Sequence, residues 1–354
     1  MRSRTAALLC GAVLGTRRAA VPLTRQRHMA AMTDAAAAGV PTARERFLFD
    51  LNGYLQVRGA VNEEEIAALN AAVDNHYDEA VPRAEQALRN AGTAEQSAFG
   101  ESGARSDLGG VLNWEGPDGD AFRGLLAHPR LAPYLAAFCG EGYRLDHQPL
   151  VMIQNTGSEG FNLHGGPLSG ADEGTFNPEL QYRCVNGQPW TSLLAMAVHL
   201  VDAPEGAGGF CVVRGSHKLN FAMPGDFASG KDPNFAAEFA EQPVTKAGDV
   251  VFFSEATIHG ALPWMAQHER RVALLRFAPP NFCYGRAYLD EWGGEDVLGM
   301  CTPAQRAVLA PPFAPRLERV MSTAQGEAGP DPEPMLRNPA KKAHDMKIFR
   351  TQYF

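Results

Sequence analysis

A series of short apolar segments after residue 141 constrains the fold more than any other feature of the chain. The segments are rich in residues that favour strands, and Gly, Pro or Asp turns separate them. They are 143–155 (YRLDHQPLVMIQN), 190–203 (WTSLLAMAVHLVDA), 208–217 (GGFCVVRGSH), 248–260 (GDVVFFSEATIHG) and 271–279 (RVALLRFAP, preceded by Arg270). Each segment predicts a strand, and 190–203 predicts a long buried one.

The first half of the chain has helical patterns instead. Residues 44–60 predict a short helix and then a strand, with Gly53 between them. A second helix is expected to follow, because Asn62 is a suitable N-cap and Glu65 stands at the capping-box position. From Ile66 onward, apolar residues recur at helical spacing, which supports the same helix.

The order of the elements predicts the fold class. Residues 80–120 are polar and Gly-rich and predict a loop with helical pieces, whereas 120–140 are helical with a break near Pro129. Helices that precede a series of strands indicate an α+β layout, mainly β with a helical wrapping around a jelly roll. We expect one domain over 41–310 and a Pro-rich C-terminal extension over 311–354.

The N-terminus differs from the rest of the chain. The first 33 residues contain six arginines and no carboxylate, and the first acidic residue is Asp34. An Arg-rich, Ala-rich and acid-free start is typical of an organelle transit peptide. We therefore expect residues 1–40 to be a disordered targeting leader, with the mitochondrion as the first expectation. The alternatives are a plastid, the secretory pathway, or a cytoplasmic protein whose translation starts at Met29 or Met32.

Charge and composition argue against several classes of function. The formal net charge is −8, whereas a nucleic-acid surface would show a basic excess. No apolar run reaches the roughly 18–20 residues that a transmembrane helix needs. The six cysteines are dispersed without a CxxC pair, so neither a zinc cluster nor a dense disulfide framework is predicted.

Two of the ten histidines stand in contexts that suit a metal site. His164 lies in FNLHGGP, after a strand and before a Gly-rich loop, and His259 ends the apolar segment 248–260. They are 95 residues apart, so only a fold that brings distant strands together can make them neighbours. Neutral imidazole is a good ligand for ferrous iron, and two histidines with one carboxylate are the usual ligands in non-haem oxygenases.

Three motifs resemble those of the phytanoyl-CoA dioxygenase family of 2-oxoglutarate-dependent oxygenases. They are 201–218 (VDAPEGAGGFCVVRGSHK), 246–264 (KAGDVVFFSEATIHGALPW) and 268–281 (HERRVALLRFAPPN). The resemblance covers residues 45–300 in order and is strongest over 141–280. It implies a double-stranded β-helix, which is a cupin-like jelly roll. It also implies ferrous iron, 2-oxoglutarate as the cosubstrate, dioxygen, and oxidation of a small organic molecule with release of succinate and CO2.

The resemblance also implies the roles of individual residues. His164 and His259 match the two metal-binding histidines of the family. Arg270, eleven residues after His259, matches the arginine that pairs with the far carboxylate of 2-oxoglutarate. A planar guanidinium can hold such a carboxylate through two parallel hydrogen bonds. No catalytic residue is expected beyond the ligands of the metal and the cosubstrate.

Some assignments in this region have alternatives. Arg271 and Arg276 compete with Arg270, because a one-residue slip in a strand reverses which side chains face the core. Gln154 and Asn155 precede His164 on the expected strand and are candidates for hydrogen bonds to the cosubstrate.

The chain departs from the family pattern at the third metal ligand. The family reads His-x-Asp, whereas this chain reads His164-Gly165-Gly166, so Gly166 stands where the carboxylate is expected. A carboxylate from elsewhere, such as Asp172 or Glu173, is one way to complete the site. The position can instead stay open for chloride, as in iron and 2-oxoglutarate halogenases. The third alternative is a weak, inactive metal site.

These alternatives define the functions that we consider. Hydroxylation of a small molecule is the main expectation, with halogenation and a catalytically inactive jelly-roll binding protein as the alternatives. The long segments 80–120 and 165–190 are expected to cover the mouth of the fold and to select the substrate. No sequence feature predicts the substrate itself or the oligomeric state.

Overall fold

A computed structural model of the chain describes residues 32–34, 41–89, 91, 97–169, 172, 174–232, 234, 238–285, 294–312, 319–331 and 339–351. Most of the expected leader, 1–40, lies outside the described residues. The exception is β1 (Met32–Asp34), which pairs in parallel with β2 (Tyr54–Arg58). The described part of the C-terminal extension includes α9 (Pro339–Phe349).

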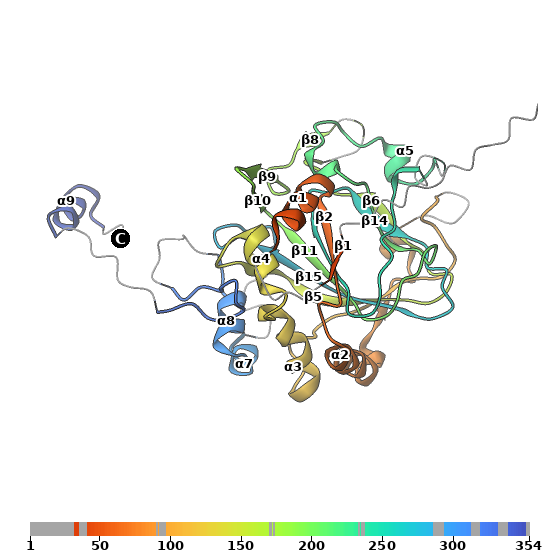
Figure 1. The fold of residues 1–354 in the computed structure, drawn as a ribbon, viewed down its shortest axis with the longest axis horizontal. Coiled ribbons are helices and arrows are strands. Elements are labelled where there is room, and N and C mark those ends of the chain that lie inside the picture. The colour runs from red at the N-terminus through yellow and green to blue at the C-terminus, as the bar shows by residue number, and fades with distance from the viewer. Residues whose placement is uncertain are drawn as a thin grey trace, which may run out of the picture.

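A large sheet forms the centre of the molecule (Figure 1). Except for the pair that includes β1, neighbouring strands in this sheet are antiparallel. Its strands are, in spatial order, β1, β2 (Tyr54–Arg58), β13 (Val250–Ser254), β11 (Leu194–His199), β15 (Arg270–Ala278), β5 (Arg144–Gln154), β4 (Ser106–Leu108) and β3 (Val81–Pro82).

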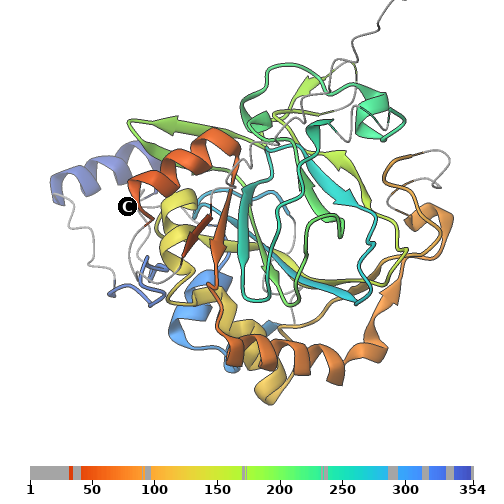
Figure 2. The same cartoon turned by 45° about the vertical axis from the view of Figure 1, so that its right-hand side comes forward.

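A second, smaller sheet faces the large one. Its strands are, in order, β12 (Gly209–Val212), β14 (His259–Leu262) and β6 (Phe161–His164). In Figure 2 the cyan strand β14 lies on the right, away from the yellow helix α4. Within the described residues the two sheets share no strand, so the fold is an open sandwich and not a closed barrel. This arrangement confirms the predicted α+β, cupin-like fold class.

Strand β11 shows how one strand serves two layers. Alternate side chains point to opposite faces of a sheet, so Leu194, Met196 and Val198 pack into the helix-covered core. Ala195 and Ala197 face the small sheet and belong to the apolar cluster between the sheets. Their small side chains leave space between the sheets, and Ala197 lines the cavity that lies there.

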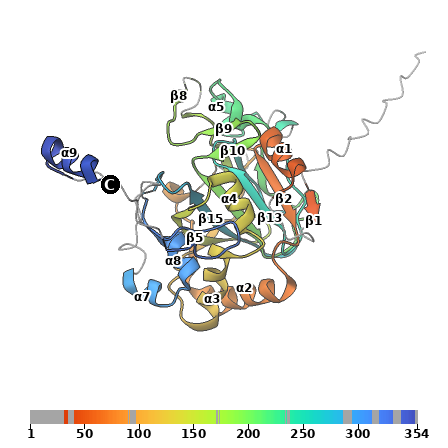
Figure 3. The same cartoon turned by 60° about the vertical axis from the view of Figure 1, so that its left-hand side comes forward.

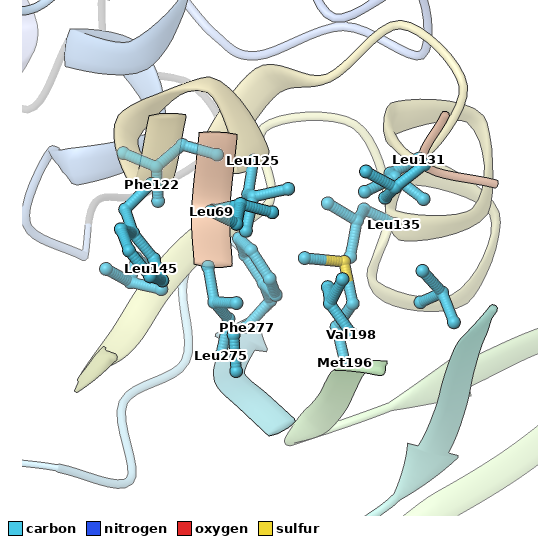
Figure 4. Close-up of a cluster of buried hydrophobic side chains, with 14 of the residues drawn as sticks. Leu69, Phe122, Leu125, Leu131, Leu135, Leu145, Met196, Val198, Leu275 and Phe277 are labelled. Carbon is cyan, nitrogen blue, oxygen red and sulfur yellow. The ribbon is translucent and has the colours of Figure 1, made fainter. Parts of the chain in front are cut away.

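Helices cover the outer face of the large sheet (Figure 3). Figure 4 shows their contact with the sheet, in which Leu69, Phe122 and Leu135 meet Met196 and Phe277. The helices are α1 (Ala43–Asn52), α2 (Glu63–Asn75), α3 (Gly116–Gly124), α4 (Ala132–Cys139), α7 (Gly294–Gly299) and α8 (Pro303–Leu309). None of the helices in the described ranges is long and apolar enough to cross a bilayer.

Two hairpins and a short helix lie in the connections. The hairpins are β7 (Leu168–Ser169) with β8 (Thr175–Phe176), and β9 (Tyr182–Val185) with β10 (Gln188–Thr191). The short helix is α5 (Gly225–Ala228), which follows the small-sheet strand β12. Together with single 3₁₀ turns, these elements complete the described structure.

Two predicted strands are each divided in the structure. The segment 190–203 was predicted as one strand, but it contains the end of β10 and then β11, which belong to different sheets. The segment 248–260 likewise contains β13, a turn, and the start of β14. His259 therefore begins a strand of the small sheet and does not end an apolar strand. The predicted loop 80–120 also contributes two strands of the large sheet, the edge strand β3 and its neighbour β4.

Candidate metal centre and its cavities

The small sheet brings the two predicted histidines together. His164 is the last residue of β6, His259 is the first of β14, and the two are direct partners in the antiparallel register. Their ring centroids are 4.2 Å apart. A separation of 95 residues in sequence thus becomes side-by-side placement at one end of a strand pair, as the metal-site hypothesis requires.

Backbone carbonyl groups orient both imidazole rings. His164 donates from Nδ1 to the carbonyl of Asn162 at 3.0 Å, and His259 donates from Nδ1 to the carbonyl of Thr257 at 2.7 Å. Because a carbonyl oxygen only accepts, each Nδ1 carries the proton and each Nε2 keeps a lone pair for a metal. Burial lowers the pKa of both histidines, that of His259 to about 3, so both rings are neutral near pH 7.

A carboxylate completes the cluster. Glu255, in the turn between β13 and β14, places Oε2 3.4 Å from Nε2 of His259. One ligand atom from each of Glu255, His164 and His259 lies within 4.8 Å of the others, so the three groups can hold one divalent ion. Burial alone would raise the pKa of Glu255, but the positive charge of Arg276 and its hydrogen bond to the carboxylate lower it to about 2. The carboxylate is therefore ionised.

An arginine faces the same centre from the large sheet. Arg270, the first residue of β15, is only 2 % exposed and donates from Nη1 to Oε1 of Gln154 at 2.5 Å. Its Nε is buried and has no hydrogen-bond partner within the described residues. Burial and the nearby charge of Arg105 lower the pKa of Arg270 to about 10, so it stays cationic at neutral pH. An unpaired donor in a buried guanidinium is suited to an anionic ligand.

Two cavities meet at the metal cluster. The first, which we call the inner cavity, has a volume of about 270 Å³, lies between the sheets and is lined by His164, His259, Gln154 and Arg270. The second, the outer cavity, has a volume of about 530 Å³ and lies under the loops beyond β6. Residues that line both cavities are His164 and Arg276, so a metal held by His164 would be reached from either side.

Sequence comparison identifies the family. Residues 49–272 match the family described as Phytanoyl-CoA dioxygenase (PhyH). The chain belongs to the phytanoyl-CoA dioxygenase family. As a member of the phytanoyl-CoA dioxygenase family, it is a non-haem iron, 2-oxoglutarate-dependent oxygenase. No curated protein sequence matches the chain significantly.

Solved structures show the same fold as this phytanoyl-CoA dioxygenase family member. HygX from Streptomyces hygroscopicus with nickel and 2-oxoglutarate bound has a TM-score of 0.55 at 18% identity, over 68% of this chain and 88% of that chain. HygX with iron bound has a TM-score of 0.52 at 17% identity, over 69% of this chain and 89% of that chain. At these identities the likeness concerns the fold alone.

The structure also separates the competing candidates for the phytanoyl-CoA dioxygenase cosubstrate residues. Arg271 points away from the cavity and pairs with Glu269 and Asp74, as expected for an arginine on a solvated strand end. Asn155 is exposed and does not line the inner cavity, because the alternation of β5 turns Gln154 inward and Asn155 outward. Arg276 also lines the inner cavity, but its Nε donates to Oε1 of Glu255 at 2.5 Å. Gln154 and Arg270 remain the cosubstrate candidates.

The third-ligand candidates that the sequence suggested lie elsewhere. Asp172 is exposed, and its Oδ1 accepts a hydrogen bond from the backbone N–H of Gly225 at the start of α5. Glu173 lies outside the described residues. Glu255 was not singled out from the sequence, because the predicted strand 248–260 concealed the turn that carries it. Its spacing of four residues from His259 is the one local signal that was present.

Proposed function

We propose that this phytanoyl-CoA dioxygenase family member hydroxylates a small polar organic molecule and releases succinate and CO2. The observation that carries the proposal is that three groups line one cavity. Two are imidazoles whose Nε2 atoms can bind a metal, and the third is a buried arginine whose Nε has no hydrogen-bond partner within the described residues. His164 and His259 would hold ferrous iron. With dioxygen and 2-oxoglutarate, iron supplies the oxidising power that converts a substrate C–H bond to an alcohol as the oxo acid loses CO2.

The inner cavity suits 2-oxoglutarate. Arg270 would pair with the far carboxylate, while Gln154 fixes the guanidinium by accepting one of its hydrogen bonds. Arg105 lines the same cavity, but Asp107 compensates its charge at 2.9 Å, so Arg270 is the cation that would attract the far carboxylate. Apolar side chains, among them Phe253 and Val272, form other parts of the wall and limit the water that would weaken these charged contacts.

The outer cavity suits a polar substrate. It adjoins the metal cluster through His164, and its wall includes His147, Asn177, Arg276 and Tyr284, each of which can hydrogen-bond a ligand. His147 is held by Asp146, whose Oδ2 is 2.9 Å from Nδ1, and its ring stacks on Tyr284. A substrate with hydroxyl, carbonyl or acidic groups would therefore be positioned beside the metal by several fixed partners.

Halogenation is the second candidate function. It is favoured by Gly166, which leaves the family's carboxylate position without a side chain and so could admit chloride. Visible spectroscopy of the anaerobic protein with ferrous iron and 2-oxoglutarate separates the two candidates. Hydroxylation predicts a metal-to-ligand charge-transfer band that chloride does not move, whereas halogenation predicts a chloride-dependent shift of that band.

Replacement of the arginine tests the cosubstrate site. We expect Arg270→Gln to raise the Kd for 2-oxoglutarate roughly 10- to 150-fold, the range for loss of hydrogen bonds to a charged group. Arg271→Gln is the matched control, because Arg271 is the adjacent arginine and faces away from the cavity. Titration of the charge-transfer band measures both variants. Equal affinity in the Arg270→Gln variant and the wild type would remove Arg270 from the site.

A further inference from the structure

The backbone after His164 is unsuited to a carboxylate ligand at the family's position. Gly165 and Gly166 have φ values of +91° and +94°, a region that L-residues with a side chain rarely adopt. A Cβ on Gly165 would also lie 2.6 Å from the carbonyl oxygen of Thr257. An aspartate at position 166 would thus require a strained backbone, so the glycine pair is a structural feature in its own right.

The same glycines allow the turn with Glu255 to approach. The atoms that a Cβ on Gly165 would strike are the carbonyl oxygens of Thr257 and Glu255, at 2.6 and 2.8 Å. The turn between β13 and β14 therefore packs against bare backbone. Its position is fixed from the other side by the N–H of Glu255, which donates to the carbonyl of Leu193 at 3.0 Å. The absence of a side chain at position 165 therefore allows the turn that carries Glu255 to pack against the backbone there.

From this geometry we propose that Glu255 is the carboxylate ligand of the metal, in place of the aspartate that the family carries two residues after its first histidine. The proposal rests on the iron-dependent function proposed above. The spacing of the ligand atoms suits a metal ion. Two metal–ligand bonds of about 2.1 Å at right angles place the two ligand atoms about 3 Å apart. The observed separation between Glu255 Oε2 and His259 Nε2 is 3.4 Å.

Arg276 positions this carboxylate. Its Nε donates to Oε1 of Glu255 at 2.5 Å, which leaves Oε2 directed toward the histidines. Metal-binding carboxylates are commonly held by such a second contact. The competing interpretation is that Glu255 serves only as the buried ion-pair partner of Arg276. Removal of the carboxylate should weaken metal binding if Glu255 is a ligand, and should leave metal affinity unchanged if Glu255 serves only as an ion-pair partner.

A protein-supplied third ligand has a consequence for the reaction. If Glu255 is a metal ligand, its carboxylate occupies the coordination position that the halide takes in a halogenase. The proposal therefore favours hydroxylation and predicts that a halide site appears only when the side chain of Glu255 is removed.

Cobalt(II) binding to the full chain tests the proposal without reference to turnover. We expect Glu255→Gln to weaken cobalt affinity at least tenfold and to change the visible cobalt spectrum. Glu269→Gln is the matched control, because Glu269 is also paired with an arginine, Arg271, but lies outside the metal cluster. The control should bind cobalt as the wild type does. Circular dichroism verifies that both variants are folded.

A second variant distinguishes the loss of a ligand from the loss of packing as the cause of weaker cobalt binding. In Glu255→Ala the vacated space should admit formate, which should restore cobalt affinity and the wild-type spectrum in part. Chloride should perturb the spectrum of this variant and leave that of the wild type unchanged. Unaltered affinity and spectrum in Glu255→Gln would overturn the ligand assignment while the proposed function stands. Absence of metal binding in the wild type would overturn the proposed function itself.

Discussion

At the scale of single residues, His217 is a buried histidine outside the metal cluster. Its Nε2 donates to the carbonyl of Asp50 at 3.0 Å. A Cβ on Gly53 would lie 2.5 Å from its Nδ1, so glycine is required there by contact as well as by its φ of +81°. Burial, and then the charge of Lys218, lower the pKa of His217 to about 4. The folded protein therefore keeps this ring neutral.

His217 should make stability depend on pH. The unfolded chain binds a proton at this residue below its ordinary pKa of 6.5, whereas the folded chain does so only near 4. The free energy of unfolding should therefore fall as pH decreases, by about 1 kcal/mol from this residue between about pH 7 and pH 5.5. Denaturant unfolding of metal-free wild type and His217→Gln measures it. The variant should show the smaller pH slope, and equal slopes would contradict the assignment.

Sequence reasoning predicted a shared site for His164, His259 and Arg270, which all line the inner cavity in the structure, but it missed Glu255. The first three were found because the family motif fixes their spacing. Glu255 lies in a Ser-Glu-Ala-Thr turn that contains no Gly, Pro, Asn or Asp, so only the weaker turn preference of Ser and Thr was present. Local spacing could not show that this turn approaches position 165, because that contact joins distant parts of the chain.

At the scale of elements, the long predicted strands divide because the chain changes sheets. The segment 248–260 is buried throughout, but β13 pairs with β11 in the large sheet whereas β14 pairs with β12 and β6 in the small one. The Ser-Glu-Ala-Thr turn between the two strands does not by itself show that the pairing partners change. The hydrophobic pattern of this segment predicted strands, but the ends of β13 and β14 depend on their pairing partners, which the pattern does not contain.

The close approach between the end of β6 and the β13–β14 turn can be tested by Gly165→Ala. The added Cβ meets two carbonyl oxygens and also adopts an unfavourable φ. We expect the free energy of unfolding to fall by about 1–3 kcal/mol and cobalt affinity to fall with it, because His164 adjoins the site of strain. Thermal unfolding and cobalt titration measure the two effects.

Gly187→Ala is the control for backbone strain alone. Gly187 has a φ of +72° in the β9–β10 hairpin, and nothing lies within 4 Å of an added Cβ. This variant should lose some stability, about 1 kcal/mol, but should keep wild-type cobalt affinity. If both alanine variants bind cobalt equally well, the close contact at Gly165 has no part in forming the metal centre.

At the scale of the whole molecule, the candidate site joins the two layers of the sandwich. The histidines belong to the small sheet, Arg270 and Gln154 belong to the large sheet, and Glu255 lies on the chain as it passes from one to the other. The sandwich class was predictable from the order of helices and strands. The pairing order of the large sheet was not, because it depends on contacts between residues far apart in sequence.

Metal binding should therefore stabilise the entire domain. At a hundredfold excess over its Kd, cobalt should add about 2.7 kcal/mol to the free energy of unfolding, provided that it does not bind the unfolded chain. The corresponding rise in Tm should disappear with a chelator. His164→Ala should abolish the response, because it removes a proposed ligand. A cobalt-induced rise of the same size in His164→Ala would place the metal elsewhere.

The carbonyl groups that accept the hydrogen bonds from Nδ1 of His164 and His259 both belong to the main chain, which affects how mutations act near the site. In many metal proteins such supports are side chains, which a point mutation can delete. Here Asn162 and Thr257 supply peptide oxygens, so a substitution at either position keeps the acceptor as long as the strand path is preserved. A mutational scan around the histidines should thus find that Asn162 tolerates changes of side-chain chemistry. At Thr257 such changes should lower stability, because its buried hydroxyl group donates to the carbonyl of Gly53 at 2.9 Å. Proline should be tolerated at neither position, because it would alter the course of the backbone.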